Sequence, residues 1–221
     1  MRSNSLNSML TTTGVVAALF VLAGCNKAQT PVTPDTAAAN NAADTATNTV
    51  ASNNPAVAGA EDATAAAVGA AAAPAAAATS SGFITAAATS DMYEIAAARI
   101  ARQKATDPAV KAFAARMIHD HTASTEALRK AIAPGAVTAS LPTGIDERRK
   151  GLIDNLQKVA PADFDKTYMD QQVAAHDEAA SLFNGYADHG DNDALKAFAT
   201  KTAPTIQAHL AMAKRTRAGL K

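Results

Sequence analysis

Apolar residues recur at spacings of three and four along the chain after Gly82. This spacing puts them on one face of a helix, and no segment alternates residue by residue as a half-buried strand does. Turns that contain proline or glycine divide the pattern into four long helices and one short helix. The predicted ranges are 83–105, 108–133, 145–159, 163–188 and 193–218. The pattern therefore predicts an all-α fold, a four-helix bundle with an additional short helix in the connection between its second and third long helices.

Each long helix carries one strongly polar residue on its otherwise apolar face. These residues are Glu94, His121, His176 and His209. Glu94 lies 13 residues before Asp107 and His121 lies 14 residues after it, so the two are level across an antiparallel turn. His176 lies near the middle of its helix. The connection over residues 134–161 is long enough to cross the bundle, and with that crossover His209 comes within reach of the other three.

Burying one carboxylate and three imidazoles apart from one another would cost several kcal/mol. Together they form an ordinary ligand set for one transition-metal ion, Zn²⁺, Fe²⁺ or Cu²⁺. Asp120 flanks the same face and can orient a ligating ring through a hydrogen bond. The alternative is a polar network without metal, in which Glu94 is hydrogen-bonded to one or two histidines and to water. The sequence leaves both interpretations open.

The two remaining histidines are predicted to lie at the surface. His119 shares its helix face with Arg116 and Glu126, and His189 falls in a turn. Pro204 lies inside the last predicted helix, where it removes one backbone hydrogen bond and favours a bend close to His209.

The N-terminal region has the layout of an export signal. Residues 14–23, GVVAALFVLA, form an apolar run that is too short to span a bilayer, which needs about 20 residues. Leu22-Ala23-Gly24-Cys25 follows and looks like the lipobox of bacterial lipoproteins. The sequence thus predicts a signal peptide over residues 1–24 and a lipidated Cys25. By resemblance to the sorting rules of enteric bacteria, Asn26 in place of aspartate favours the outer membrane over the inner one, with the domain facing the periplasm.

Between the signal and the helices, the chain is rich in Ala, Thr, Asn and Pro and lacks aromatic residues. Such a segment has little to bury and is predicted to be disordered. The expected organisation is therefore a lipidated cysteine and disordered tether over residues 25–81, followed by the four-helix bundle domain over residues 82–221.

Charge and composition exclude several classes of function. The formal net charge is zero, so no nucleic-acid partner is expected. Cys25 is the single cysteine, which rules out a disulfide within the chain and a thiolate metal cluster. No glycine-rich phosphate loop and no activated nucleophile stand out, so an acid–base hydrolase is the least favoured class.

Several motifs together resemble a known bacterial envelope family. They are Phe83, Glu94, the run VKAFAARMIHDHT from Val110 to Thr122, Phe164-Asp165-x-x-Tyr168, His176, and Pro204-x-x-x-x-His209-Leu210. In order and spacing they are similar to domain-of-unknown-function family 4142, labelled predicted outer membrane protein, over residues 82–216. The resemblance implies a ferritin-like four-helix bundle and export to the envelope, and it implies no activity.

The ferritin-like resemblance does not imply a di-iron centre. Such centres use a Glu-x-x-His motif on two of their helices. Here the residues three positions before His121, His176 and His209 are Ile118, Val173 and Ile206. A carboxylate-bridged pair of metal ions is therefore disfavoured.

The sequence thus predicts a cell-envelope lipoprotein, anchored to the membrane through lipid. Its bundle is expected to act as a non-enzymatic interaction or stress-related module whose protein partner the sequence does not identify. The alternative is a metal-binding protein with a mononuclear Glu/His₃ site in the bundle core.

Overall fold

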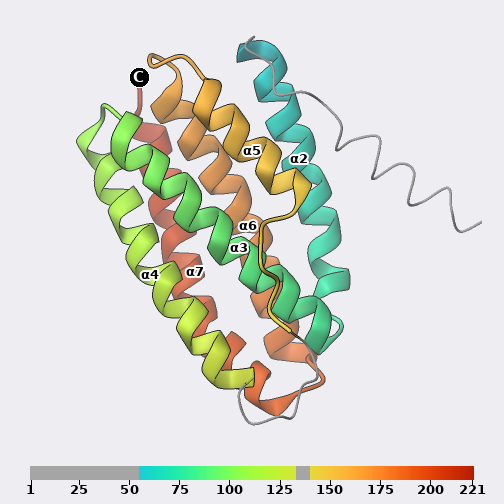
Figure 1. Ribbon diagram of the computed structural model, residues 1–221. Coiled ribbons are helices and arrows are strands. Elements are labelled where there is room, and N and C mark those ends of the chain that lie inside the picture. Colours follow the sequence, from blue (N-terminus) through green and yellow to red (C-terminus); the bar gives the residue numbers. More distant parts are fainter. Residues whose placement is uncertain (1–54, 133–139) are drawn as a thin grey trace, which may run out of the picture. The chain divides into compact units, whose positions relative to one another are not determined.

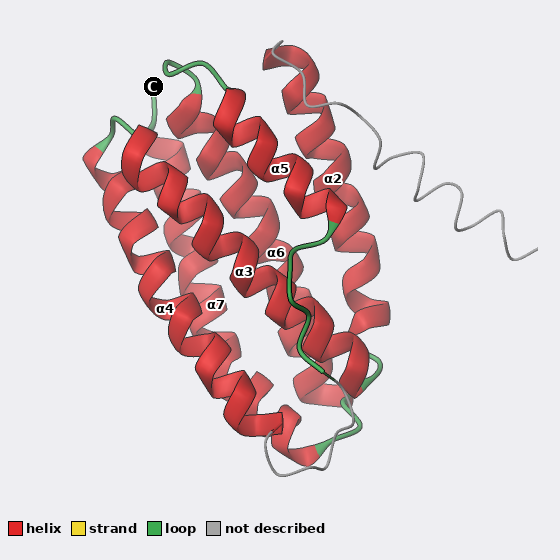
Figure 2. Ribbon diagram, in the orientation of Figure 1, coloured by secondary structure: helices red, strands yellow, loops and turns green. Residues whose placement is uncertain are grey.

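The structure is a computed structural model that describes residues 55–132 and 140–221. These residues form helices only (Figures 1 and 2). The helices are α2 (Pro55–Ala76), α3 (Ser80–Lys104), α4 (Pro108–Ile132), α5 (Glu147–Lys158), α6 (Phe164–His189) and α7 (Asp193–Gly219). The all-α prediction is confirmed, and α3 to α7 begin and end within three residues of the predicted positions.

Side-chain caps explain why the helices begin where they do. Thr79 Oγ1 accepts a hydrogen bond from the amide of Gly82, and Asn192 Oδ1 accepts one from the amide of Leu195. At the start of α4, Asp107 Oδ1 accepts from the amide of Ala109 at 2.7 Å. Each cap of this kind stabilises a helix by about 1 kcal/mol.

The connection that contains α5 sets the direction of the last two helices. Phe83, near the start of α3, contacts Phe183 near the end of α6 and Phe198 near the start of α7. At the opposite end of the bundle, Phe113 near the start of α4 contacts Tyr168 near the start of α6. Helices α4 and α6 therefore run in the same direction, and the connection between them crosses the length of the bundle, as predicted.

Two apolar clusters make up the core, one towards each end of the bundle. The first includes Phe83, Leu128, Phe183, Phe198 and Ile206. The second includes Phe113, Met117, Tyr168, Met169 and Ala213. On each of the four bundle helices, buried polar residues fall between the residues of the two clusters. A polar layer therefore separates the two halves of the core, and the predicted site residues lie in it.

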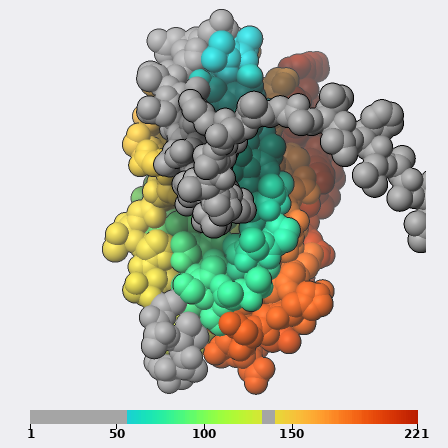
Figure 3. All heavy atoms as spheres, turned by 90° about the vertical axis from the view of Figure 1, so that its right-hand side faces the viewer, coloured from blue at the N-terminus to red at the C-terminus, as the bar shows by residue number. Residues whose placement is uncertain are grey.

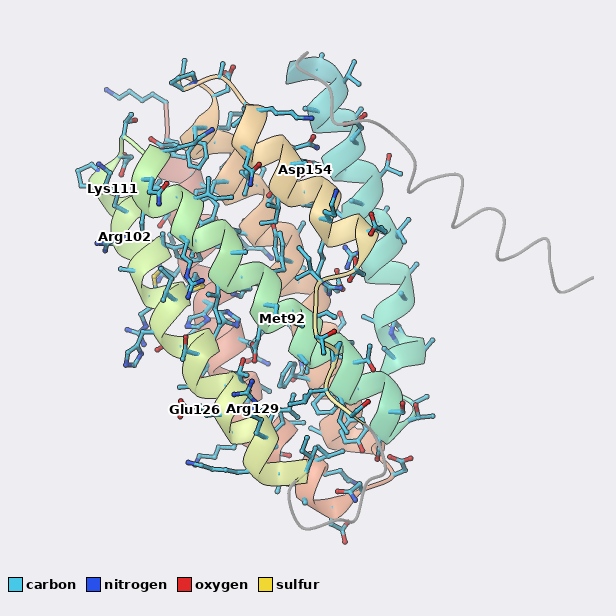
Figure 4. The ribbon with its side chains drawn as sticks, viewed as in Figure 1. Met92, Arg102, Lys111, Glu126, Arg129 and Asp154 are labelled. Carbon is cyan, nitrogen blue, oxygen red and sulfur yellow. The ribbon has the colours of Figure 1, made fainter. Side chains whose placement is uncertain are left out.

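Charged residues outside this layer cover the surface. Arg102 on α3, and Lys111 and Glu126 on α4, point away from the bundle (Figure 4). Among the described residues, no helix has the length and apolarity needed to cross a membrane.

The predicted disordered tether needs a correction for residues 55–76, which form helix α2. This helix lies beside the connection that contains α5 and packs on α6 (Figure 3). Ala73 and Ala77 are buried in the first apolar cluster. A Cβ built on Gly185 of α6 would lie 3.2 Å from Ala77 Cβ, so small side chains let the two segments approach closely. Cys25 and the predicted signal peptide lie outside the described residues.

Polar contacts hold α2 in place as well. Asp62 accepts hydrogen bonds from Asn155 Nδ2 and from Gln171 Nε2, each at 2.7 Å. Arg148 donates to the Ala65 carbonyl oxygen at 3.0 Å. These bonds join α2 to both α5 and α6, which explains how a helix that buries only small residues, Ala58, Gly69 and Ala73, stays docked.

We expect Asp62→Ala to loosen α2, because it leaves the amides of Asn155 and Gln171 without their acceptor. A loss of about 1–3 kcal/mol of stability is expected. Faster amide hydrogen exchange over residues 55–76 would measure the loosening. Glu61→Ala is the matched control, since Glu61 is the neighbouring carboxylate and has no hydrogen bond. Equal exchange in the two variants would contradict an anchoring role for Asp62.

Candidate metal centre

Three histidines from three helices meet in the polar layer. His121 of α4, His176 of α6 and His209 of α7 each offer one ring nitrogen, and these nitrogens all lie within 4.8 Å of one another. The ring centroids are 5.5–5.6 Å apart. None of the three residues is more than 2% exposed. The three histidines therefore lie at the same depth in the bundle, as their positions along the helices predicted.

The other nitrogen of each ring is held by an acceptor of the protein. The pairs are His121 Nδ1 with Asp91 Oδ1 at 2.8 Å, His176 Nδ1 with the Gln172 carbonyl oxygen at 2.9 Å, and His209 Nε2 with Asp120 Oδ2 at 2.8 Å. Carboxylates and carbonyl groups only accept, so these ring nitrogens carry the hydrogen. In a neutral ring, the nitrogen that faces the centre then presents a lone pair.

The three central nitrogens have no hydrogen-bond partner among the residues that the structure describes. They are His121 Nε2, His176 Nε2 and His209 Nδ1, and all three are buried. A bound metal ion lies about 2.0–2.1 Å from each imidazole nitrogen, which puts tetrahedral nitrogens about 3.3 Å apart. The observed nitrogens would have to move closer together to reach that separation. The three histidines therefore form a possible site for one metal ion.

The protonation states of two rings suit metal binding. Burial lowers the pKa of His176 to about 3 and that of His209 to about 4, so both are neutral at neutral pH. His121 differs. Burial lowers its pKa, but the hydrogen bond and the charge of Asp91 outweigh this and raise it above its usual value. His121 is thus the ring most able to carry a proton when no other cation is near.

Glu94 borders the three-histidine group instead of lying within it. Its Oε1 is 3.8 Å from Nδ1 of His176, and its Oε2 has no hydrogen-bond partner in the protein. Burial raises the pKa of this carboxyl group, which is 1% exposed. The sequence pattern correctly predicted that Glu94 is buried beside the histidines. As a ligand it would have to change its side-chain conformation.

Asp120 holds His209 from the edge of the bundle. It also accepts hydrogen bonds from Arg116 Nε and His119 Nδ1, each at 2.7 Å. Burial opposes ionisation, but the hydrogen bonds from His119, Arg116 and His209 set the pKa of Asp120 well below its usual range. The orienting contact agrees with the sequence-based expectation. His119 is 82% exposed at its side chain, also as expected.

Asp91 is the functional residue that the sequence analysis missed. Its Oδ1 accepts from His121, and its Oδ2 accepts from Thr125 Oγ1 at 3.0 Å. Asp91 lies four residues after Ala87 and three residues before Glu94, so the three residues share one face of α3. The neighbouring Ser90 is buried too, so the helical pattern alone does not choose between them.

A pocket of about 290 Å³ leads from the surface between α4 and α7 to the histidines. His121 and His209 both line it, and hydroxyl groups of Ser124, Thr202 and Thr205 lie along it. Ser124 Oγ is buried and has no hydrogen-bond partner in the protein. The polar layer is therefore reached from one side, between two particular helices.

Fold and site together define an all-α helical-bundle protein with a buried three-histidine cluster. Residues 63–216 match the family described as Domain of unknown function (DUF4142), and the chain belongs to this family. The matched region includes the second half of α2 and all three histidines. No curated protein and no solved structure matches the chain.

Proposed function

We propose that this protein binds one transition-metal ion through His121, His176 and His209. One observation carries the proposal. Three buried ring nitrogens without protein partners converge, and the other nitrogen of each ring is fixed by an acceptor. Metal-binding histidines in proteins have this arrangement, because the outer hydrogen bond fixes the tautomer and directs the lone pair to the metal.

The alternative is a metal-free network in which Glu94 is hydrogen-bonded to one or two histidines and to water. Direct pairing with the histidines is not seen among the described residues: Glu94 Oε1 lies 3.8 Å from His176 Nδ1, and the three central nitrogens have no partner there. Each buried polar atom left in that state costs about 1–3 kcal/mol. A cation at the centre satisfies the three nitrogens at once, and the negative charges of Asp91 and Asp120 behind two of the rings favour it.

The donor set favours particular ions. Imidazole nitrogen suits Zn²⁺, Cu²⁺, Fe²⁺ and similar ions, whereas Ca²⁺ and Mg²⁺ require oxygen ligands. One ion is proposed, because the described residues contain a single group of three or more candidate ligands with this geometry. A role in holding or sensing a metal ion follows most directly from a set of three imidazole donors.

We further propose that the protein is a lipoprotein of the bacterial envelope, anchored through Cys25. The support is the apolar run over residues 14–23 and the Leu22-Ala23-Gly24-Cys25 motif. Asn26 favours the outer membrane and a bundle that faces the periplasm. Several acyl chains would be needed for firm anchoring, since one chain alone binds marginally. The interaction or stress-related role stays a prediction, and so does a protein partner.

The metal proposal predicts one ion per chain in untagged protein purified from a periplasm. We expect His176→Ala to abolish this binding, and the exposed His189→Ala to leave it unchanged. An added metal ion at 100 times its Kd should stabilise the protein by about 2.7 kcal/mol, a rise in Tm of about 5–10 °C. Elemental analysis and thermal unfolding measure these effects. A metal-free wild-type protein with no rise in Tm would contradict the proposal.

Asp91 is predicted to act by positioning the ring of His121. Asp91→Asn should weaken metal affinity by about 10–100-fold while the protein remains folded. Asp154→Asn is the control, since Asp154 is on α5 (Figure 4), a helix that carries none of the three histidines. Isothermal titration with Zn²⁺ gives the affinities, and circular dichroism checks the fold. An unchanged Kd in Asp91→Asn would show that the carboxylate only stabilises the fold.

The anchor is tested separately from the metal. We expect the wild-type protein to incorporate a labelled fatty acid in a bacterial host and to fractionate with the outer membrane. Cys25→Ser should abolish the label and release the protein from the membrane, with Ser52→Ala as an unaffected control. Label that persists in Cys25→Ser would place the modification elsewhere or refute it.

A further inference from the structure

We propose that the pocket between α4 and α7 binds a small anion of a few atoms, which completes the coordination of the metal ion. This inference rests on the proposed three-histidine metal site. It goes further by assigning a function to the pocket and to its polar lining, which the metal site alone does not require.

Three protein ligands leave a coordination position for another molecule. Zinc sites with three protein ligands commonly keep the fourth position for water or substrate, whereas closed structural sites use four protein ligands. The structure brings together three histidines, and the nearest carboxylate, Glu94, lies outside the group. The protein therefore supplies a ligand set of the open type.

The position is accessible from one side. His121 and His209 line the pocket between α4 and α7, and each has one buried ring nitrogen without a partner among the described residues. Glu94 comes from α3, a helix that contributes no residue to this pocket. A molecule that enters the pocket would thus reach the metal without displacing Glu94.

The lining of the pocket selects the charge of the ligand. Lys201 lies along it and forms no ion pair with any described residue. Arg116 and Asp120 also line the pocket, but they pair with each other. The carboxylate of Asp120 is further occupied by His119 and His209. The unpaired charge in the pocket is therefore positive, which favours an anion.

The polar atoms of the pocket provide a hydrogen bond for that anion. Ser124 lies one helical turn after His121, and its buried hydroxyl has no partner in the protein. Thr202 and Thr205 add hydroxyl groups from α7. The volume of about 290 Å³ lies at the small end of ligand pockets and is ample for a small anion.

Azide is a suitable probe, and Co²⁺ a suitable metal, because the visible absorption bands of Co²⁺ respond to its ligands. The experiment titrates azide into the full, Co²⁺-loaded protein. Ala127 on α4 is exposed and lines the pocket, so Ala127→Phe fills the pocket without altering the core. Ala112→Phe, on an exposed position of the same helix outside the pocket, is the matched control.

We expect azide to shift the Co²⁺ bands of the wild-type protein and of Ala112→Phe equally. Ala127→Phe should bind Co²⁺ with the same stoichiometry but bind azide at least about tenfold more weakly. Ser124→Ala should also weaken azide binding, by a smaller factor than Ala127→Phe does.

Three results would overturn the inference while the metal site stands. They are Co²⁺ bands that azide leaves unchanged, azide affinity in Ala127→Phe equal to the wild type, and an azide response that appears only in Glu94→Gln. The last result would mean that Glu94 fills the fourth position. Failure of the wild-type protein to bind Co²⁺ or any other metal would instead overturn the proposed function, and the inference with it.

Discussion

The hydrogen bond on the outer nitrogen of each buried histidine is the constraint on which the site depends. Imidazole has two nitrogens, and a buried ring must satisfy both. Asp91, the Gln172 carbonyl and Asp120 each take one nitrogen, so the second nitrogen of every ring is left to face the centre. The protein thereby fixes the tautomer and the orientation of each ring, and it directs the second nitrogen of each ring towards the other two.

The bundle topology makes this convergence possible. Because the connection through α5 crosses the bundle, α4 and α6 run in the same direction, and their histidines lie at the same depth. The two apolar clusters then close the layer from both ends. Because its surroundings are apolar, each hydrogen bond within the polar layer is stronger than it would be in water. For the same reason, a polar atom of the layer without a partner costs more free energy. A cation bound there would therefore join helices α4, α6 and α7, and its binding free energy would add to the folding free energy.

Helical periodicity was sufficient to predict the fold and the four inward-facing polar residues, because a period of 3.6 determines which residues share a face. It was insufficient where the structure depends on partners distant in sequence. Helix α2 was missed because an alanine-rich segment has little apolar pattern, and its docking needs Asn155, Gln171 and Gly185 from other helices. Asp91 was missed because Ser90 fits the same face. The place of Glu94 outside the histidine group depends on a side-chain conformation that spacing does not specify.

The run from Met117 to Thr122 places one histidine in solvent and another in the core of the bundle. His121 points inwards, and His119 lies in solvent. Asp120 lies between them and binds His119 and Arg116 on the outside and His209 on the inside. A carboxylate with three donors stays ionised over a wide pH range, so His209 keeps its orienting partner under acidic conditions. The outer face of α4, which periodicity marks as ordinary solvent-exposed helix, is therefore part of what holds the core histidine in place.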